Sequence, residues 1–468
     1  MRPKHDGACA IESCGGAETQ ALPFTLKDAH ATAGMRTTTG SPSLAHTIPS
    51  VDSPVTARLK AAGGILLGKT NVPAMLADFQ TNNPVFGRTN NPWNVERTPG
   101  GSSGGQAAII AAGGSPLGLA SDIGGSIRVP ATFCGIAGLK PTAGRLPDPN
   151  NVGLSLGEKA IVSQAGVLGR SVADVELGYR VLKGDQLPRG EQGVPVEEDD
   201  PSSVEIAKLR VAYYTDDGTL AVSGAVRRAV TEAAGVLAGQ GAQVVEWQPP
   251  AVPHAVDIFF GILSADGGAG ARKALAGSRV DPRIGQLIRL AGMPRPILAG
   301  LEPALRVAGQ RHAADMLRNF GYRDTLHYWE MVVAQDAYQE QFLRALDSDP
   351  GGPFDLIVCP ACAVPAFPHG GSKDLVTAGG YAVLYNVLGY PAGVVPVTRV
   401  QPGEESGRRS GRDAMERAAQ LADRGSAGLP VGVQVVARPW HEHVALAAMR
   451  SIWEAMRTRP DFPDQPPE

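Results

Sequence analysis

Two glycine-rich stretches, "TPGGSSGGQAAII" (98–110) and "SDIGGSIRVPATFCGIAGLKPTAGRL" (121–146), carry the strongest signal in this chain. Ser102 lies in the first stretch and Ser126 in the second, and both serines follow glycines. Glycine has no Cβ, so the backbone around it can take conformations that turn several N–H groups toward one point. A serine beside such N–H groups has what acyl transfer requires, a nucleophile next to an oxyanion hole.

The sequence around these stretches alternates short strand-like runs with helix-like runs, which predicts an α/β fold. The expected strands cover residues 22–26, 64–68, 116–121, 209–214, 242–247, 354–359, 392–397 and 431–437. The expected helices cover residues 104–114, 224–241 and 442–456. Because no sharp change of composition divides the 468 residues, we expect one large domain. Residues 184–206 should form a loop, and the highly charged residues 401–427 an exposed surface insertion with one helix.

Composition excludes several classes of protein. The net charge of −3 argues against a general nucleic-acid binder, which usually carries a basic excess. No run approaches the roughly 18 apolar residues of a membrane span, and residues 1–20 lack the apolar stretch of a signal peptide. We therefore expect a cytoplasmic protein.

The five cysteines are too few for a disulfide scaffold. Cys359 and Cys362 form a C-x-x-C, but no second such pair and no nearby histidine pair completes a metal site. We interpret them as the end of a buried strand and expect neither a metal nor a cofactor.

One motif points to a different chemistry. Residues 63–70, "GGILLGKT", match the G-x-x-x-x-G-K-T pattern of a phosphate-binding loop, so an ATP-binding module is the non-enzyme alternative. Such a loop needs flexible residues whose N–H groups converge on phosphate. Ile65, Leu66 and Leu67 instead favour a buried strand, so we interpret the match as coincidental.

A second motif, "GSSGG" (101–105), fits the G-x-S-x-G elbow of α/β-hydrolases and would make Ser103 the nucleophile. That mechanism requires a histidine base. The candidates are scattered and none lies in a distinctive motif: His254, His312, His327, His369, His441 and His443.

The two glycine-rich stretches together resemble the signature of the amidase signature hydrolases. Further segments are similar to the fatty acid amide hydrolase branch of that family: "LPFTLKD", "NPVFGRTNNPW", "LYNVLGYPAGVVPVT" and "GLPVGVQVVARPW". The resemblance covers residues 21–456. It implies a central mixed, twisted β-sheet covered by helices on both faces. In the domain division that we expect, residues 1–20 are a non-homologous N-terminal segment, residues 21–458 the amidase signature domain and residues 459–468 a C-terminal tail.

The resemblance also implies the catalytic base, which in this family is a lysine at a strand end. That position corresponds to Lys27 in "LPFTLKD", whereas Lys69 in "GKTN" is a separate structural landmark. A base must be neutral near pH 7, and a buried lysine can lose its proton through desolvation whereas an arginine cannot. Lys27 follows an apolar strand, where burial is plausible.

The family mechanism, transferred to this sequence, assigns the remaining roles. Neutral Lys27 takes a proton from Ser102, which takes one from Ser126, and Ser126 attacks the amide carbonyl. The expected oxyanion hole consists of the backbone N–H groups of Ile123, Gly124, Gly125 and Ser126. The resemblance also implies a cis peptide between Gly101 and Ser102, and supporting roles for Ser103 and Arg128.

The expected reaction is hydrolysis of a carboxylic amide to an acid and an amine, with fatty acid amides as favoured substrates. A small-amide or aryl-amide amidase is one alternative, and the glutaminase component of an amidotransferase is another. Ala77 and Ser264 lie near positions where relatives carry large aromatics, which predicts a wider or differently shaped acyl channel. Residues 284–309 occupy the place of the family's membrane-docking cap, so peripheral membrane contact is weighed there against ordinary core packing. The sequence leaves a homodimer open.

Overall fold

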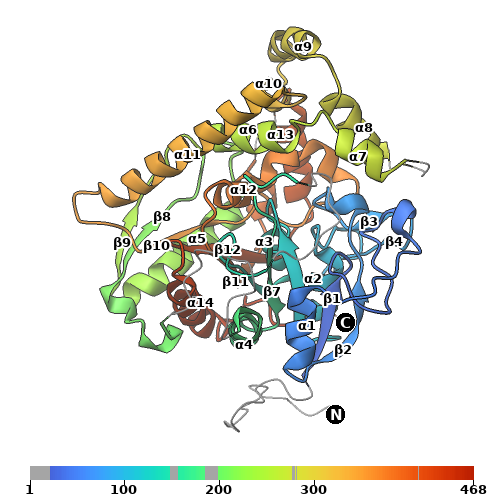
Figure 1. Ribbon diagram of the computed structural model, residues 1–468. Coiled ribbons are helices and arrows are strands. Elements are labelled where there is room, and N and C mark those ends of the chain that lie inside the picture. Colours follow the sequence, from blue (N-terminus) through green and yellow to red (C-terminus); the bar gives the residue numbers. More distant parts are fainter. Residues whose placement is uncertain are drawn as a thin grey trace.

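The computed structural model of the chain describes residues 22–147, 157–184, 199–276, 280, 282–408 and 411–467. A ten-stranded sheet runs through the molecule in the order β2-β1-β5-β7-β6-β11-β12-β10-β8-β9 (Figure 1). Neighbouring strands are parallel at both ends of this order and antiparallel from β5 to β10, so the sheet is mixed as predicted. Its strands are β1 (Pro23–Lys27), β2 (Ile65–Thr70), β5 (Leu117–Asp122), β6 (Ala137–Lys140), β7 (Gln164–Gly169), β8 (Arg210–Tyr213), β9 (Gln243–Glu246), β10 (Leu356–Pro360), β11 (Ala392–Arg399) and β12 (Pro430–Ala437).

Helices cover both faces of the sheet, as expected. They are α1 (Pro54–Ala61), α2 (Gly104–Ala111), α3 (Arg128–Cys134), α4 (Val172–Lys183), α5 (Gly224–Gly239), α6 (Val252–Leu263), α7 (Ala269–Ala274), α8 (Pro282–Ala291), α9 (Arg295–Val307), α10 (Arg311–Asn319), α11 (Thr325–Asp347), α12 (Gly380–Val387), α13 (Ala414–Asp423) and α14 (Glu442–Met456). On one face, α1 packs against α4, α4 against α14 and α14 against α5. On the other face, α2 packs against α3.

Strand β11 shows how the two faces are separated. Side chains alternate between the faces of a strand. A Cβ at Gly393 would collide with Met449 of α14, whereas the adjacent Val394 packs in the cluster that contains Ala131 of α3. The small residue at 393 therefore lets α14 approach the sheet closely, while the valine fills the core beneath α3.

The apolar run in "GGILLGKT" does not form a buried strand, which corrects the sequence-based expectation. Strand β2 is the last strand at its end of the sheet, where it pairs with β1. Its Ile65 and Leu67 are 50% and 54% exposed, and Leu66 between them packs against the core. Alternate residues of this edge strand therefore face opposite sides, and the side of Ile65 and Leu67 is left open to solvent.

The described part of the charged segment 401–427 contains one α-helix, α13, as predicted, but this segment is less exposed than expected. Met415, Ala418, Ala419 and Ala422 of α13 are buried, and Asp423 at the end of the helix is 2% exposed. The segment is therefore part of the packed structure. The expected N-terminal segment 1–20 and most of the expected loop 184–206 lie outside the described residues.

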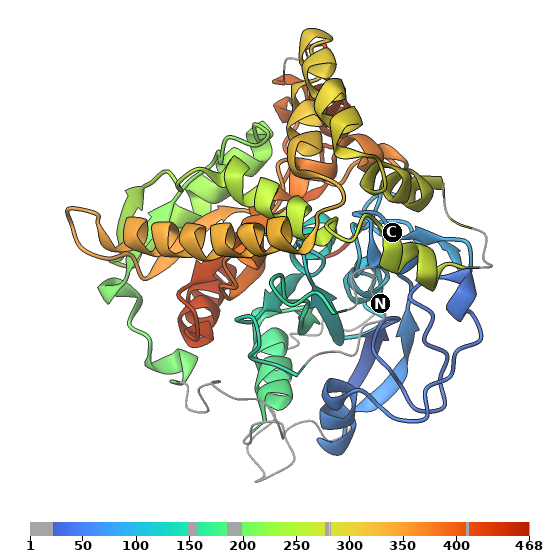
Figure 2. The same cartoon turned by 45° about the horizontal axis from the view of Figure 1, so that its top comes forward.

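Residues 284–309 form most of α8 and all of α9. Helix α9 projects from the top of the molecule next to α10, whereas α8 lies lower, beside α7 (Figures 1 and 2). Within α9, whose residues are all described, Leu298 alone is buried, and Ile297, Leu301 and Val307 are 52%, 39% and 90% exposed. Ordinary core packing, one of the two expectations for this segment, therefore does not describe α9. Across the described residues, no helix combines the length and the apolar character that a membrane crossing needs.

Candidate functional site

The predicted site residues come together where β1 and β5 end. These strands run parallel, with Leu26 opposite Leu119, so Lys27 at the end of β1 lies beside Ser121 and Asp122 at the end of β5. The two glycine-rich stretches meet at this edge. The N–H of Ser103, just before α2, donates to the carbonyl of Ser126, just before α3, at 3.2 Å.

Lys27 is buried and directed at one of the two predicted serines. Its side-chain nitrogen donates to the hydroxyl of Ser102 at 2.8 Å, to the carbonyl of Ser121 at 2.9 Å and to the hydroxyl of Ser121 at 3.1 Å. Burial disfavours the charged form and lowers the pKa of Lys27 to about 7, although the nearby charge of Asp122 acts in the opposite direction. Near neutral pH, a substantial fraction of Lys27 is therefore uncharged and able to accept a proton.

The two predicted serines differ in their surroundings. Ser102 is 1% exposed and follows a cis peptide bond from Gly101, as the family resemblance implied. A Cβ at Gly101 would lie 2.3 Å from the carbonyl oxygen of Asp78, so only glycine fits before this serine. Ser126 is 7% exposed. Among the described residues, no hydrogen bond joins the hydroxyls of Ser102 and Ser126. Catalytic hydrogen bonds are often long before substrate binds, so the absence of this bond is compatible with proton transfer between Ser102 and Ser126.

Ser103, the alternative nucleophile, is fully buried, and its hydroxyl donates to the carbonyl of Ser121 at 3.4 Å. Within the described part of the chain, no histidine forms a hydrogen bond with Ser103. The serine–histidine arrangement of α/β-hydrolases is therefore not found around this residue.

Arg128 supports the site through a buried ion pair with Asp122. The Arg128 guanidinium donates through Nε to Asp122 Oδ2 at 3.0 Å and through Nη2 to Asp122 Oδ1 at 2.8 Å. Burial alone would raise the pKa of Asp122, but the charge and hydrogen bonds of Arg128 outweigh it, so the pKa lies well below its usual range. Arg128 also donates to Asn386 Oδ1 at 2.6 Å and to Gln434 Oε1 at 2.7 Å. These bonds tie the N-terminus of α3 to α12 and β12.

Asp122 holds the backbone of the glycine-rich turn in place. Its carboxylate accepts from the N–H groups of Gly125 at 2.8 Å and Ile127 at 3.0 Å. Gly125 has a φ of +110°, a conformation that favours glycine. The N–H of Gly125, one of the four expected oxyanion donors, is thus already engaged with Asp122. In the described structure, the N–H groups of Ile123, Gly124 and Ser126 have no backbone acceptor.

Two aromatic rings lie against this turn. The Cζ of Phe259, on α6, would lie 2.8 Å from a Cβ at Gly124, and a ring carbon of Phe79 would lie 3.7 Å from a Cβ at Gly125. Phe79, two residues after Ala77, was not predicted from the sequence as an aromatic residue of the site. The hydroxyl of Ser264 has a structural role. It donates to the carbonyl of Phe260 at 2.6 Å and accepts from the N–H of Gly321 at 2.8 Å.

Lys69 has a structural place, as predicted. Its side-chain nitrogen lies 3.2 Å from Asp28 Oδ1 and donates to the carbonyl of His30 at 2.8 Å and to Thr37 Oγ1 at 2.5 Å. These contacts fix the turn that follows Lys27. Because Gly68, Lys69 and Thr70 belong to strand β2, their backbone does not form the convergent nest that a phosphate-binding loop requires.

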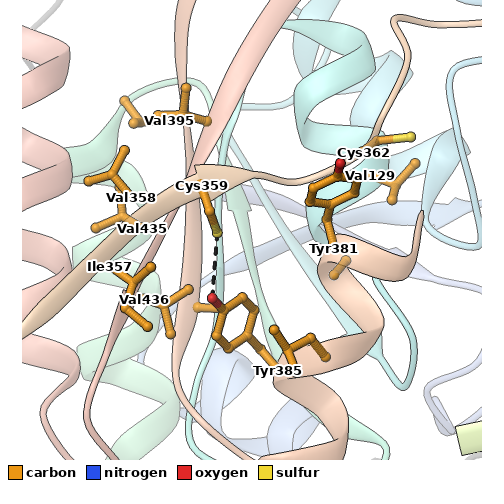
Figure 3. Packing of buried hydrophobic residues seen from close by; sticks show 14 of the residues in the cluster. Val129, Ile357, Val358, Cys359, Cys362, Tyr381, Tyr385, Val395, Val435 and Val436 are labelled. Carbon is orange, nitrogen blue, oxygen red and sulfur yellow. Dashed lines mark hydrogen bonds between the residues drawn. The ribbon is translucent and has the colours of Figure 1, made fainter. Parts of the chain in front are cut away.

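Cys359 and Cys362 lie in the core, as expected for a buried strand end (Figure 3). Cys359 is in β10, where its sulfur contacts the Tyr385 hydroxyl at 3.7 Å and accepts from Gln434 Nε2 at 3.2 Å. Burial raises the pKa of Cys359 to about 11 and that of Cys362 to about 12. Both thiols therefore stay protonated and unreactive near neutral pH.

Sequence reasoning named Lys27, Ser102, Ser103, Ser126 and Arg128, and the structure brings all five together. It gave no role to Ser121 or Asp122, although both stand in the quoted motif. A carboxylate two residues before a glycine pair was the available signal for Asp122. Its partners come from distant segments, and nothing in the sequence linked Asn386 or Gln434 to the site.

Several known proteins are similar to this chain in sequence or in structure. The family model described as Amidase matches residues 19–446. The chain is 35% identical over 447 residues to "Fatty-acid amide hydrolase 1" of Sus scrofa, covering 93% of this chain and 75% of that protein. It is 31% identical over 441 residues to "Acetamidase" of Aspergillus oryzae (strain ATCC 42149 / RIB 40), covering 91% and 75%. A solved structure named "Fatty acid amide hydrolase" superposes with a TM-score of 0.75 at 26% identity, covering 93% of this chain and 73% of that one.

Proposed function

The chain belongs to the amidase family of hydrolases acting on amides, and we propose that it cleaves fatty acid amides through a covalent intermediate on Ser126. The observation that carries the proposed mechanism is the 2.8 Å hydrogen bond from the side-chain nitrogen of Lys27 to Ser102. A buried lysine with a pKa of about 7 has the protonation behaviour that a general base needs near neutral pH.

In the proposed acylation step, neutral Lys27 Nζ accepts the hydroxyl proton of Ser102. Ser102 Oγ accepts the hydroxyl proton of Ser126, and Ser126 Oγ forms a bond to the amide carbonyl carbon. The carbonyl oxygen becomes an oxyanion, which the N–H groups of Ile123, Gly124 and Ser126 can stabilise. The expected fourth donor, Gly125, instead holds Asp122 and so keeps the turn in shape.

Collapse of the tetrahedral intermediate breaks the C–N bond. The proton returns from Lys27 through Ser102 to the departing amine nitrogen, so the amine leaves neutral. Water then attacks the ester carbonyl on Ser126, transferring its proton along the same route. The second step releases the carboxylic acid and restores the Ser126 hydroxyl. Every proton in this scheme is carried by Lys27, the two serines, the water or the amine.

The lipid preference is proposed from two observations. The first is the similarity to fatty acid amide hydrolases in sequence and in structure. The second is the aromatic and aliphatic surroundings of the glycine turn, where Phe79, Phe259 and Ala382 lie close to Gly124 and Gly125.

A membrane contact is proposed for the projecting helix α9. Its Ile297, Leu301 and Val307 are exposed, and exposed apolar side chains on a projecting helix suit a membrane interface. Such a contact would let a lipid amide reach the enzyme from the bilayer rather than from water.

A chain-length series tests the substrate proposal. Primary amides from acetamide to long-chain amides should be compared by kcat/KM with the same enzyme preparation. Each buried methylene contributes about 0.8 kcal/mol, or roughly fourfold in affinity, so kcat/KM should rise by orders of magnitude until the acyl channel is full. A flat profile would contradict the lipid proposal and favour the small-amide alternative. Preferential cleavage of glutamine would favour the amidotransferase alternative.

A further inference from the structure

A cavity of about 800 Å³ lies apart from the serines, between the N-terminus of α5, helix α10 and helix α13. Its wall includes residues from the segments 216–227, 311–315, 407–408 and 416–423. Lys27, Ser102 and Ser126 do not line it. The proposed reaction therefore leaves this cavity without a role.

The N-terminus of α5 opens into the cavity without its usual cap. Ser223 occupies the N-cap position with extended backbone angles, φ −66° and ψ 157°, but its side chain makes no capping hydrogen bond. Ser223 is 5% exposed, and its hydroxyl oxygen is buried without a partner in the described structure. The first turn contains no acidic residue and is followed by Arg227. A helix N-terminus carries partial positive charge, so Arg227 adds to a charge that nothing in the first turn balances. The next residue, Arg228, is paired with Glu232 and Glu404 and is not part of the cavity wall.

A second cation, Arg408, lines the cavity from a different segment of the chain. The Arg408 side chain is 9% exposed, and it donates through Nε to Asp423 Oδ2 at 2.7 Å and through Nη1 to the carbonyl of Ala221 at 2.6 Å. Its third nitrogen, Nη2, is buried without a partner in the described residues. Arg408 is thus held firmly next to the α5 end while one of its donor groups remains unused.

The buried carboxylate in this wall is outnumbered by guanidinium groups. Asp423 is 2% exposed and feels the charges of both Arg408 and Arg97. Burial raises the pKa of Asp423 although both arginines oppose the shift, so the negative charge here is only weakly favoured. A guanidinium group, in contrast, keeps its charge in proteins as a rule. The interior side of the cavity therefore carries excess positive charge.

The carboxylates at the rim are largely neutralised by arginines. Asp315 pairs with Arg306 at 2.6 Å and Arg318 at 2.7 Å, and Glu416 pairs with Arg311 at 3.3 Å.

Asp216 is the exception among the rim carboxylates. Its Oδ1 accepts the N–H of Gly218, and it forms no ion pair within the described chain. The negative charge of this single carboxylate does not offset the combined positive charge of the helix N-terminus and Arg227. The Nη1 of Arg227 donates to the hydroxyl of Thr215 at 2.9 Å. The cavity as a whole is therefore suited to an anion.

We propose that this cavity binds a compact oxyanion, the carboxylate or phosphate group of a small metabolite or the free ion, at the N-terminus of α5. The oxyanion accepts hydrogen bonds from the Ser223 hydroxyl and from the first free N–H groups of the helix. Arg227 and Arg408 supply charge-assisted hydrogen bonds from two sides. Such an anion completes the missing cap, satisfies the unused donors of Ser223 and Arg408 and balances the charge of the first turn.

The binding test uses the full chain, with inorganic phosphate and acetate as separate probes in isothermal titration calorimetry at constant ionic strength set with chloride. We expect saturable binding of at least one of the two ions, and the arm that binds more tightly identifies the class of oxyanion. Ser223→Ala and Arg227→Ala should each weaken that binding by about tenfold, the usual effect of losing one hydrogen bond to a charged group. Ser223→Thr, which keeps the hydroxyl, should retain most of the affinity.

Arg344→Ala is the matched control, because Arg344 is exposed on α11, where it pairs with Glu340 away from the cavity wall. It should bind as the wild type does, and all variants should unfold at similar temperatures without ligand. Ser126→Ala should also bind with unchanged affinity, which separates this site from the catalytic turn. The proposal would be overturned if neither ion showed saturable binding. It would also be overturned if Ser223→Ala and Arg227→Ala bound the ion as tightly as the wild type, or if Ser126→Ala lost binding.

Discussion

The side-chain nitrogen of Lys27 lies 2.8 Å from the hydroxyl oxygen of Ser102, and both side chains are almost completely buried. A charged lysine in such a place would be strongly disfavoured unless it had a counterion within contact distance. The bonded partners of Lys27 are instead neutral oxygens of Ser102 and Ser121. In the proposed mechanism, this contact makes Lys27 rather than Lys69 the base and gives the reaction its pH dependence.

The first prediction concerns the pH profile. Because burial lowers the pKa of Lys27 to about 7, kcat/KM for amide hydrolysis should fall as the pH decreases below about 7 and level off above it. The direction follows from the requirement for the neutral amine, which protonation removes. Lys27→Ala should lower kcat/KM by roughly 10²–10⁴, the usual contribution of a general base. The measurement is kcat/KM across pH 5 to about 9 in buffers of equal ionic strength.

Lys69→Ala is the control for this profile. Removing Lys69 leaves the buried Asp28 with its Thr38 hydrogen bonds but without its ion-pair partner, so we expect reduced stability and somewhat lower activity but an unchanged midpoint near pH 7. A midpoint that survives in Lys27→Ala and disappears in Lys69→Ala would reverse the assignment of the two lysines. Tight magnesium-dependent ATP binding that depends on Lys69 would revive the phosphate-loop alternative.

The second prediction concerns stability. Arg128→Ala removes the partner of the fully buried Asp122 and should reduce the free energy of unfolding by about 3–5 kcal/mol in urea denaturation. Arg128→Lys should recover little of it, because lysine cannot make the paired contacts of a guanidinium. The pKa of Asp122 is held low in the folded state, so its contribution is present at neutral pH and is lost as the pH falls below the ordinary aspartate range. Equal stability of Arg128→Ala and wild type at pH 7 would contradict this role.

The third prediction tests the glycine turn. A Cβ at Gly124 would lie 2.8 Å from the ring of Phe259, whereas a Cβ at Gly125 would meet Ala382 at 2.8 Å and force a strained positive φ. Overpacking of this kind typically costs about 1–3 kcal/mol. Gly124→Ala should therefore lose stability and activity, and the added substitution Phe259→Leu should restore part of both. Gly125→Ala should not respond to Phe259→Leu. Thermal unfolding and kcat/KM of the single and double variants provide the comparison.

Much of the fold could be predicted from local sequence patterns. The helix expected at 442–456 begins and ends where α14 does, because its apolar residues recur with helical spacing across its whole length. Strands β6 and β7 were missed, since their segments "AGLK" and "QAGVLG" are rich in small residues and weak in the usual strand formers. Their place in the sheet comes from pairing with β5 and β11, which is a tertiary property.

The candidate site could be predicted as far as its residues are neighbours in a motif. Ser102 and Ser126 were found because the glycine pattern marks them, and Lys27 and Arg128 were found through the family resemblance. The partners of Arg128 on α12 and β12 lie about 250 to 300 residues further along, and only the folded sheet brings them together. The solvent exposure of the apolar side chains on β2 and α9 could not be predicted from the sequence either. The same apolar residues would occur there if another layer of the protein covered them.

The most direct measurement of the central claim is the site of acylation. A fluorophosphonate probe should form one covalent adduct, located by peptide mass spectrometry on Ser126, because this serine adjoins the free N–H groups of the turn. Ser102→Ala should remain folded but acquire the adduct far more slowly, since the proton route to Lys27 is broken, and Ser103→Ala should react at a rate closer to wild type. Ser126→Ala should form no adduct. An adduct on Ser102 or Ser103, or labelling that persists at the wild-type rate in Ser126→Ala, would contradict the account.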